Sequence, residues 1–208
     1  MIFDLLFIVL FLGSMIALIC ALILMIRGSH RIAIRLLRAL AAGWGVYLSV
    51  VALVAFATPQ QIVPLGQDLC FDEMCFAAVH AEKAAEVGPA SRQVQARGVF
   101  YVVTVRVTNR SRGRTESEGG LRALLWDARK GYEISLEGQR AWEAANGETA
   151  KLTVRLQSGG SAQSTQVFDL PKESTVAGLV LSHGFTPGYF VIGESPLFHK
   201  PTVMRIAP

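Results

Sequence analysis

Two long uncharged segments at the start of the chain limit its architecture more than any other feature. The first covers residues 5–26, which are 22 residues, and the second covers residues 39–57, which are 19 residues. As a helix the first segment is about 33 Å long, and a hydrocarbon core is about 30 Å thick. Pro59 follows the second segment and cannot continue a helix. The pattern predicts a transmembrane helical hairpin over residues 1–58, with helices at about 3–27 and 38–57.

A cleavable signal peptide is the alternative for the first segment. A signal peptide has a positively charged start and an apolar stretch of about 7–15 residues. This chain starts with Met-Ile-Phe-Asp, its uncharged stretch is longer, and a second stretch follows. These features favour a retained anchor.

The connector at residues 27–38 predicts the orientation of the hairpin. It carries four arginines and no acidic residue, whereas the flanks on the other side carry Asp4 and Asp68 and no Lys or Arg. Cytoplasmic loops are enriched in Lys and Arg. We therefore expect a cytosolic connector, with both termini and the rest of the chain outside. In a bacterium this places the protein in the inner (cell) membrane with its larger part extracytoplasmic.

The four arginines recur at spacings of four, four and three, so they share one helix face. We expect them to act as topology determinants whose side chains reach the lipid headgroups. Specific binding of anionic lipid, or contact with a partner, is the alternative. The residues are Arg27, Arg31, Arg35 and Arg38.

The same arginines account for most of the formal net charge of +4. Residues 1–58 hold four Arg and one Asp, a net charge of +3, and residues 59–208 hold 16 basic and 15 acidic residues, a net charge of +1. A nearly neutral outer region lacks the basic surface that nucleic-acid binding requires. The lipid bilayer and a protein are therefore the expected partners, and nucleic acid is not.

The outer region predicts a mainly β fold. Residues 99–109 alternate strictly, and Tyr101, Val103, Val105 and Val107 lie on the face expected in the core. Residues 59–69 are expected to be a linker, residues 84–97 a loop, and Trp142 lies in a segment of uncertain structure. Several short strands without a long amphipathic helix predict an antiparallel β-sandwich over 70–208, with an extension from about 183. The other expected strands are 75–83, 121–127, 132–134, 152–156, 164–170, 178–182, 189–192 and 203–206.

Five runs in the outer region occur in a distinctive order. They are FYVVTVRVTN at 100–109, WDARKGYE at 126–133, ANGET at 145–149, QVFDLP at 166–171 and GLVLS at 178–182. Together they resemble the telokin-like immunoglobulin-fold domain of bacterial membrane proteins and lipoproteins, over roughly residues 70–182. The resemblance implies an Ig-like sandwich outside the cytosol, with proposed roles in adhesion, binding and envelope assembly and no catalytic residues to transfer. This chain differs by its two membrane spans and its extension from residue 183.

Cys70 and Cys75 form the most informative pair of side chains in the outer region. On one extended strand they would point to opposite faces, so a bond between them requires a turn at residues 71–74. An oxidising compartment favours this structural disulfide. Metal binding with His80, Asp72 or Glu73, and redox cycling, are the alternatives, although redox pairs normally have two intervening residues.

The sequence gives little indication of catalysis or of metal or cofactor binding. The sequence has no P-loop, HExxH, Gly-x-Ser-x-Gly or dinucleotide motif, and its four histidines are scattered. Phe198, His199 and Lys200 lie between two prolines and form a possible recognition loop, although a fixed connection into a last strand is favoured. We therefore expect no enzyme activity, no metal and no cofactor. The expected function is that of an envelope protein whose Ig-like domain mediates protein binding or assembly; a periplasmic sensory module for a ligand, metal or glycan is the alternative.

Overall fold

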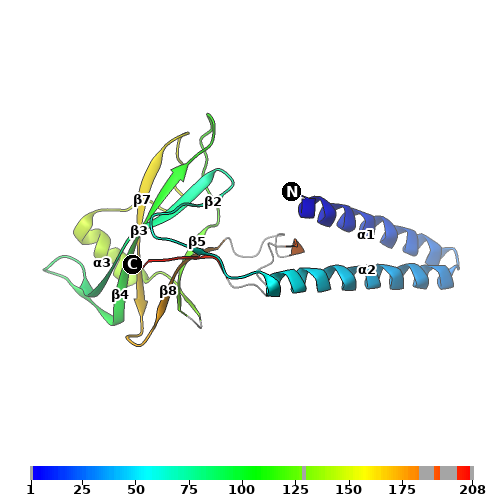
Figure 1. The fold of residues 1–208 in the computed structure, drawn as a ribbon, viewed down its shortest axis with the longest axis horizontal. Helices are drawn as coiled ribbons and strands as arrows, with labels where there is room; N and C mark the ends of the chain where they lie inside the picture. The colour runs from blue at the N-terminus through cyan, green and yellow to red at the C-terminus, as the bar shows by residue number, and fades with distance from the viewer. Residues whose placement is uncertain (1, 128–129, 183–189, 193–200, 207–208) are drawn as a thin grey trace. The chain divides into compact units, whose positions relative to one another are not determined.

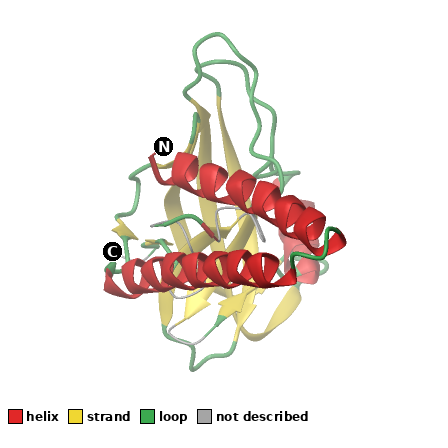
Figure 2. Ribbon diagram, turned by 90° about the vertical axis from the view of Figure 1, so that its right-hand side faces the viewer, coloured by secondary structure: helices red, strands yellow, loops and turns green. Residues whose placement is uncertain are grey.

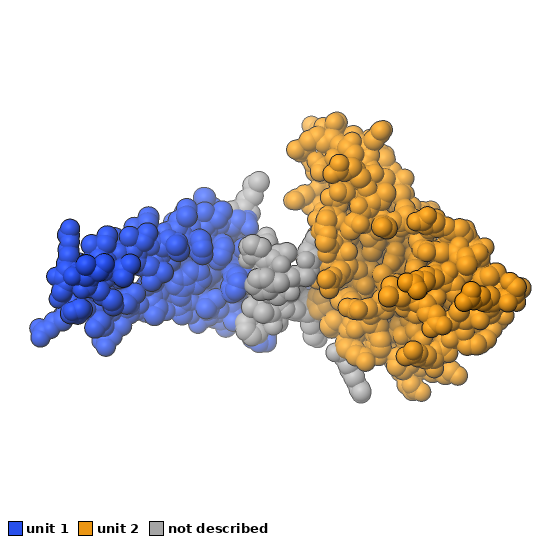
Figure 3. Space-filling view, turned by 180° about the vertical axis from the view of Figure 1, so that it is seen from behind, with its two compact units in different colours: residues 1–60, 185–200 blue, residues 61–184, 201–208 orange. Residues whose placement is uncertain are grey.

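A computed structural model describes residues 2–127, 130–182, 190–192 and 201–206 (Figure 1). The chain forms two compact units, coloured separately in Figure 3. One comprises residues 1–60 and 185–200, and the other comprises residues 61–184 and 201–208. The sequence predicted a C-terminal extension of the sandwich from about residue 183; of its described residues, 190–192 belong to the unit of the helical hairpin and 201–206 to the sandwich.

The hairpin consists of α1 (Ile2–Ile26) and α2 (His30–Ala57), which are 25 and 28 residues long. Figure 2 shows the two helices joined by a short loop. Both are long and apolar enough to cross a membrane. The predicted second helix began at about residue 38, but α2 begins eight residues earlier. No residue from His30 to Arg38 breaks a helix, and Arg, Leu and Ala are good helix formers. The predicted connector is thus reduced to a turn at 27–29, where Gly28 has a φ of +79°.

Small and polar side chains join the two helices. Ala21 and Ala33 are both buried and let the backbones approach closely. Trp44 Nε1 donates a hydrogen bond to Ser14 Oγ at 2.9 Å, and Ser14 Oγ donates to the Leu10 carbonyl at 2.7 Å. Most of the other long side chains of the two helices are apolar and exposed.

The second unit is a β-sandwich, as the sequence predicted. One sheet has the order β1-β9-β8-β5-β6 and the other has the order β2-β3-β4-β7. All neighbouring pairs are antiparallel except β1 and β9, which are parallel. The strands are β1 (Ile62–Val63), β2 (Leu69–Phe71), β3 (Met74–Val87), β4 (Val94–Asn109), β5 (Arg122–Asp127), β6 (Gly131–Tyr132), β7 (Ser161–Leu170), β8 (Val176–Ser182) and β9 (Val203–Met204).

The main core lies between the two sheets, and β4 contributes the alternating face that the sequence predicted. Tyr101, Val103, Val105 and Val107 are all buried there. The opposite face of β4 is also buried at one end, where Phe100 and Val102 form a second cluster with Val87 and Val167. This second cluster exists because a helix covers the outer face of the β2-β3-β4-β7 sheet.

That helix is α3 (Leu136–Asn146), which the sequence analysis left undefined around Trp142. Three other expectations were wrong. The strand predicted at 189–192 is absent from its described residues 190–192, which belong to the unit of the hairpin. The predicted loop at 84–97 is mostly strand, because β3 continues to Val87 and β4 starts at Val94. The predicted strand at 152–156 makes only one isolated bridge, between Leu156 and Glu116.

Candidate functional site

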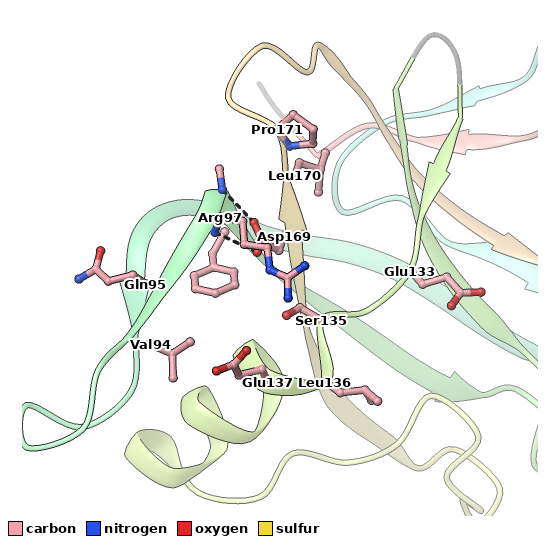
Figure 4. Close-up of a pocket in the computed structure, with 12 residues that line it drawn as sticks. Val94, Gln95, Arg97, Glu133, Ser135, Leu136, Glu137, Asp169, Leu170 and Pro171 are labelled. Atoms are coloured by element: carbon pink, nitrogen blue, oxygen red, sulfur yellow. Dashed lines mark hydrogen bonds between the residues drawn. The ribbon is translucent and has the colours of Figure 1, made fainter.

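A groove lies between the β3–β4 hairpin and the start of α3 (Figure 4). One part has a volume of about 660 Å³, and a second part of about 800 Å³ adjoins it. The two parts share Val94, Leu136 and Glu137. We call the combined surface the α3 groove; its other charged lining residues are Arg92, Arg97, Glu133, Arg140 and Asp169.

The start of α3 forms one wall of the groove, and two residues fix its position. Ser135 is the N-cap, and its side chain accepts a hydrogen bond from the Gly138 amide at 3.2 Å. Gly138 lies where the helix approaches the sheet most closely. A Cβ there would be 2.8 Å from the Phe100 ring and 3.0 Å from Val167. The close approach therefore requires glycine.

Side chains from α3 and from the loop after it also cover the free edge of β7. Gln139 donates to the Thr165 carbonyl at 3.0 Å and accepts from the Val167 amide at 2.9 Å. Thr149 Oγ1 accepts from the Thr165 amide at 2.8 Å. The Ser135 amide donates to the Val167 carbonyl, also at 2.8 Å. An open strand edge is a template for pairing with another chain, so these bonds block such pairing at β7.

The opposite wall of the groove is held by Asp169. Its carboxylate accepts hydrogen bonds from the backbone amides of Arg97 and Gly98, at 3.1 and 3.3 Å (Figure 4). Gly98 also lies against the end of β7, since a Cβ there would be 2.0 Å from the Leu170 carbonyl oxygen. Asp169 thus has a structural role, and the Arg97 side chain is left to line the pocket.

The remaining charged groups of the α3 groove have no partner in the structure. The side chains of Arg97, Glu133 and Glu137 make no ion pair or hydrogen bond within the described residues, and the same holds for Arg92 and Arg140. Leu136 lies among them with 69% of its surface exposed. An exposed leucine surrounded by unpaired charges of both signs resembles the centre and rim of a protein interface.

The same residues show little that supports catalysis. Among the described residues, no three His, Cys, Asp or Glu side chains gather as a metal site would require. The groove is lined by separate charges and has no hydrogen-bonded nucleophile and base.

The predicted cysteine pair is bonded in the structure. Cys70 and Cys75 form a disulfide with Cα atoms 4.0 Å apart, on paired positions of β2 and β3. The chain turns between the strands at Asp72, which has a φ of +48°. His80, an alternative ligand in the metal hypothesis, is exposed and instead lies 3.7 Å from Glu82. The structure therefore confirms the disulfide and the turn that it requires.

Three of the four predicted arginines share a free face of α2. Arg31, Arg35 and Arg38 are exposed and lie opposite the face carrying buried Ala33 and Val51, which packs on α1. Arg27 is exposed in the turn. None of the four makes an ion pair within the part of the chain that the structure describes. Phe198, His199 and Lys200 lie outside the described residues.

The sequence pattern did not predict the structural roles of two polar residues. Asn109 is completely buried, and its Nδ2 donates to the carbonyls of Arg114 at 2.9 Å and Leu156 at 2.8 Å. Asp127 accepts from the Lys130 amide at 2.8 Å and from the Tyr132 hydroxyl at 3.1 Å. Both residues belong to runs that carried the family resemblance, which was the available signal for them.

Comparison with known proteins gives a likeness of fold alone. No family model and no curated protein matches the sequence. A conserved hypothetical protein from Bacillus anthracis is 17% identical, with a TM-score of 0.47 over 58% of this chain and 88% of that one. The secreted protein MPT63 from Mycobacterium tuberculosis is 13% identical, with a TM-score of 0.44 over 62% and 94%. An uncharacterized β-sandwich protein from Clostridium difficile is 12% identical, with a TM-score of 0.42 over 72% and 96%.

Proposed function

We propose that this chain is a non-enzymatic, membrane-anchored envelope protein whose sandwich domain binds a protein partner outside the cytosol. The hairpin of α1 and α2 is the anchor, and the α3 groove is the binding surface. The arginines of the turn and of the start of α2 support a cytosolic position for that end of the hairpin. The sandwich then lies on the extracytoplasmic side of the bacterial inner membrane.

One observation supports the binding role most directly, and it is the exposed Leu136 within a rim of unpaired charges. Surface apolar residues are common singly, but the unpaired Arg97, Glu133 and Glu137 beside this one could each gain a partner on binding. Interface anchors are typically apolar or aromatic side chains within a polar rim. The groove offers this arrangement on a rigid wall formed by α3.

Site-specific photo-crosslinking in intact cells tests this role. A photoreactive residue at Leu136 is expected to give one discrete adduct, whereas one at Arg112, which is exposed in the loop after β4, is expected to give none. The substitutions Arg97→Glu and Arg140→Glu should abolish the Leu136 adduct, and the matched change Arg112→Glu should not. An adduct that survives both groove substitutions would contradict a role for the α3 groove.

We also propose that the sandwich is an Ig-like domain of the telokin-like type. Support comes from the order of the five runs, which fall on β4, on the β5–β6 hairpin, at the end of α3, on β7 and on β8.

Thiol labelling of intact cells tests the proposed location. Cys70 and Cys75 should react with a membrane-impermeant reagent only after reduction, and labelling without a reductant would contradict the oxidising compartment.

A small-molecule sensory role is the second proposal, and the groove volume supports it. About 660 Å³ lies within the range of typical ligand pockets. A sugar or amino acid that binds there should raise the melting temperature of the purified chain, and the increase should disappear in Arg97→Glu. No increase across a panel of such ligands would leave the protein-binding role as the better account.

A further inference from the structure

Two residues from a later part of the chain, Phe190 and Ile192, lie against the helical hairpin. The Tyr47 hydroxyl donates a hydrogen bond to the Phe190 carbonyl at 2.7 Å, across 143 positions of sequence. The Phe190 ring stacks on the Phe7 ring, with centroids 6.4 Å apart and planes 8° apart. Ile192 is 7% exposed and packs in a cluster with Tyr47 and Val51, and Val191 between them is 5% exposed. Phe190 and Ile192 therefore have a specific contact site on α1 and α2.

Their position along the helices gives their depth in a membrane. A carboxylate is costly in hydrocarbon, so Asp4 should lie near the outer headgroups, and Phe7 is then about 4.5 Å deeper along α1. On α2, Val51 and Tyr47 lie about 9 and 15 Å before the end of the helix at Ala57. The positions on both helices thus place this contact site below the outer headgroups.

The surface of the hairpin at this level has the character of a lipid-facing surface. Phe3, Leu6 and Leu53 are 46%, 48% and 68% exposed, and they lie within about one turn of Phe7 or Val51. Exposed apolar side chains gathered in this way are unfavourable in water and favourable in hydrocarbon. The exposed apolar residues around this contact site therefore indicate a membrane environment.

One backbone carbonyl and the local sequence of this segment suit that depth. A carbonyl in hydrocarbon must have a hydrogen-bond donor, and the Tyr47 hydroxyl supplies one to Phe190. The surrounding sequence, GFTPGYFVIG at 184–193, is uncharged over ten residues. An apolar stretch of this length is too short to span a bilayer but typical of a re-entrant segment.

We propose that Phe190–Ile192 enters the outer leaflet, so that the chain contacts the hydrocarbon a third time between β8 and β9. Its partner is the acyl-chain region of the bilayer, together with the groove formed by Phe7, Tyr47 and Val51. The inference rests on the membrane-spanning hairpin of the proposed function. It adds that the outer domain is tethered to the bilayer by a second segment besides the exit of α2.

Spin-label accessibility on the full chain in lipid nanodiscs tests the depth. In a Cys20→Ala background with the disulfide intact, a nitroxide is attached at Val191→Cys. Ile19→Cys on α1 serves as the bilayer control and Glu137→Cys on α3 as the water control. The label at 191 should collide with oxygen in preference to a water-soluble nickel complex, as at 19. A nickel accessibility equal to that at 137 would overturn the inference.

The controls separate this inference from the proposed function. If the label at 19 is itself accessible to nickel, the hairpin is not in the bilayer, and the membrane anchor fails. If 19 is shielded and 191 is not, only the re-entrant segment fails. The change Tyr47→Phe removes the donor to the Phe190 carbonyl, and it should raise nickel accessibility at 191 severalfold while leaving 19 unchanged.

A second measurement avoids the bulk of the label. The pair Phe7→Cys and Phe190→Cys should be joined in the nanodisc by a short bifunctional thiol crosslinker, because the two ring centroids are 6.4 Å apart. The matched pair Leu18→Cys and Phe190→Cys should not, since Leu18 lies about 16 Å further along α1. Equal yields for the two pairs would also overturn the inference.

Discussion

At the scale of single residues, the sandwich depends on a few positions where a polar group or a glycine is enclosed by backbone. Asn109 is the clearest, because its buried side chain bonds both loops at the end of β4. Its Nδ2 donates hydrogen bonds to the carbonyls of Arg114 and Leu156, and its Oδ1 accepts one from the Ser111 amide at 2.8 Å. Water cannot replace it without a rearrangement of those loops.

We expect Asn109→Ala to lower the free energy of unfolding by about 2–4 kcal/mol, because it removes three hydrogen bonds of a completely buried side chain and leaves the buried Ser111 amide without its partner. Denaturant titration of the purified chain, followed by tryptophan fluorescence, measures the change. The control is Asn146→Ala, since Asn146 bonds the Trp142 carbonyl at the exposed end of α3 and should cost less than about 1 kcal/mol. Similar losses for the two variants would contradict the role of Asn109.

Gly98 is the corresponding glycine position. We expect Gly98→Ala to destabilise the sandwich by about 2 kcal/mol or more, because the new methyl group would meet the Leu170 carbonyl at 2.0 Å. Gly119→Ala is the matched control, since a Cβ there meets nothing within 4 Å. It should leave the melting temperature unchanged or raise it slightly. A neutral result at Gly98 would show that β4 and β7 can separate there at little cost.

At the scale of elements, the two sheets and the hairpin follow from patterns that a sequence displays directly. The alternation over 99–109 predicted β4 and its core face, and the uncharged segments predicted α1 and α2. α3 was missed because its exposed face is polar and its packing face is small, with Gly138 and Ala141 against the sheet. The α3 groove was missed for the same reason, since it exists only where α3 lies beside β4.

The element α3 also protects the edge of β7. We expect Gln139→Ala to cost about 1–3 kcal/mol, because the Thr165 carbonyl and the Val167 amide lose their partners. Arg140→Ala, at the next position and exposed, should cost less than about 0.5 kcal/mol. Hydrogen exchange should show faster exchange at the Val167 amide in Gln139→Ala alone. Unchanged exchange at Val167 would exclude the capping role.

The arginines at the start of α2 are expected to set the orientation in which the hairpin inserts into the membrane. Each arginine near an anionic leaflet contributes about 1 kcal/mol, so changing Arg31, Arg35 and Arg38 together to Gln should weaken the preferred orientation by roughly 100-fold. An impermeant thiol reagent acting on Ser29→Cys in a Cys20→Ala background reports which side the turn occupies. The triple Lys variant keeps the charge and should keep the orientation. Retained orientation in the triple Gln variant would contradict the topology role.

At the scale of the whole molecule, the disulfide between Cys70 and Cys75 bears on both the proposed oxidising compartment and the stability of the sandwich. The disulfide closes a turn of four intervening residues, so its loss in Cys70→Ser with Cys75→Ser should cost only about 1–2 kcal/mol. Denaturant titration of the oxidised chain and the double variant measures this difference. A loss above about 4 kcal/mol would mean that the turn at Asp72 depends on the bond.

The parallel pairing of β1 with β9 has a consequence for biogenesis. Ile62 and Val63 are synthesised soon after α2, yet their partners Val203 and Met204 follow much later in the chain, after β8. Met204 is completely buried in the main core and also pairs with Leu179 of β8. The β2-β3-β4-β7 sheet can assemble as soon as residue 170 has been synthesised. The other sheet must wait with an open edge for β9, so the sandwich cannot close before residue 204 is available.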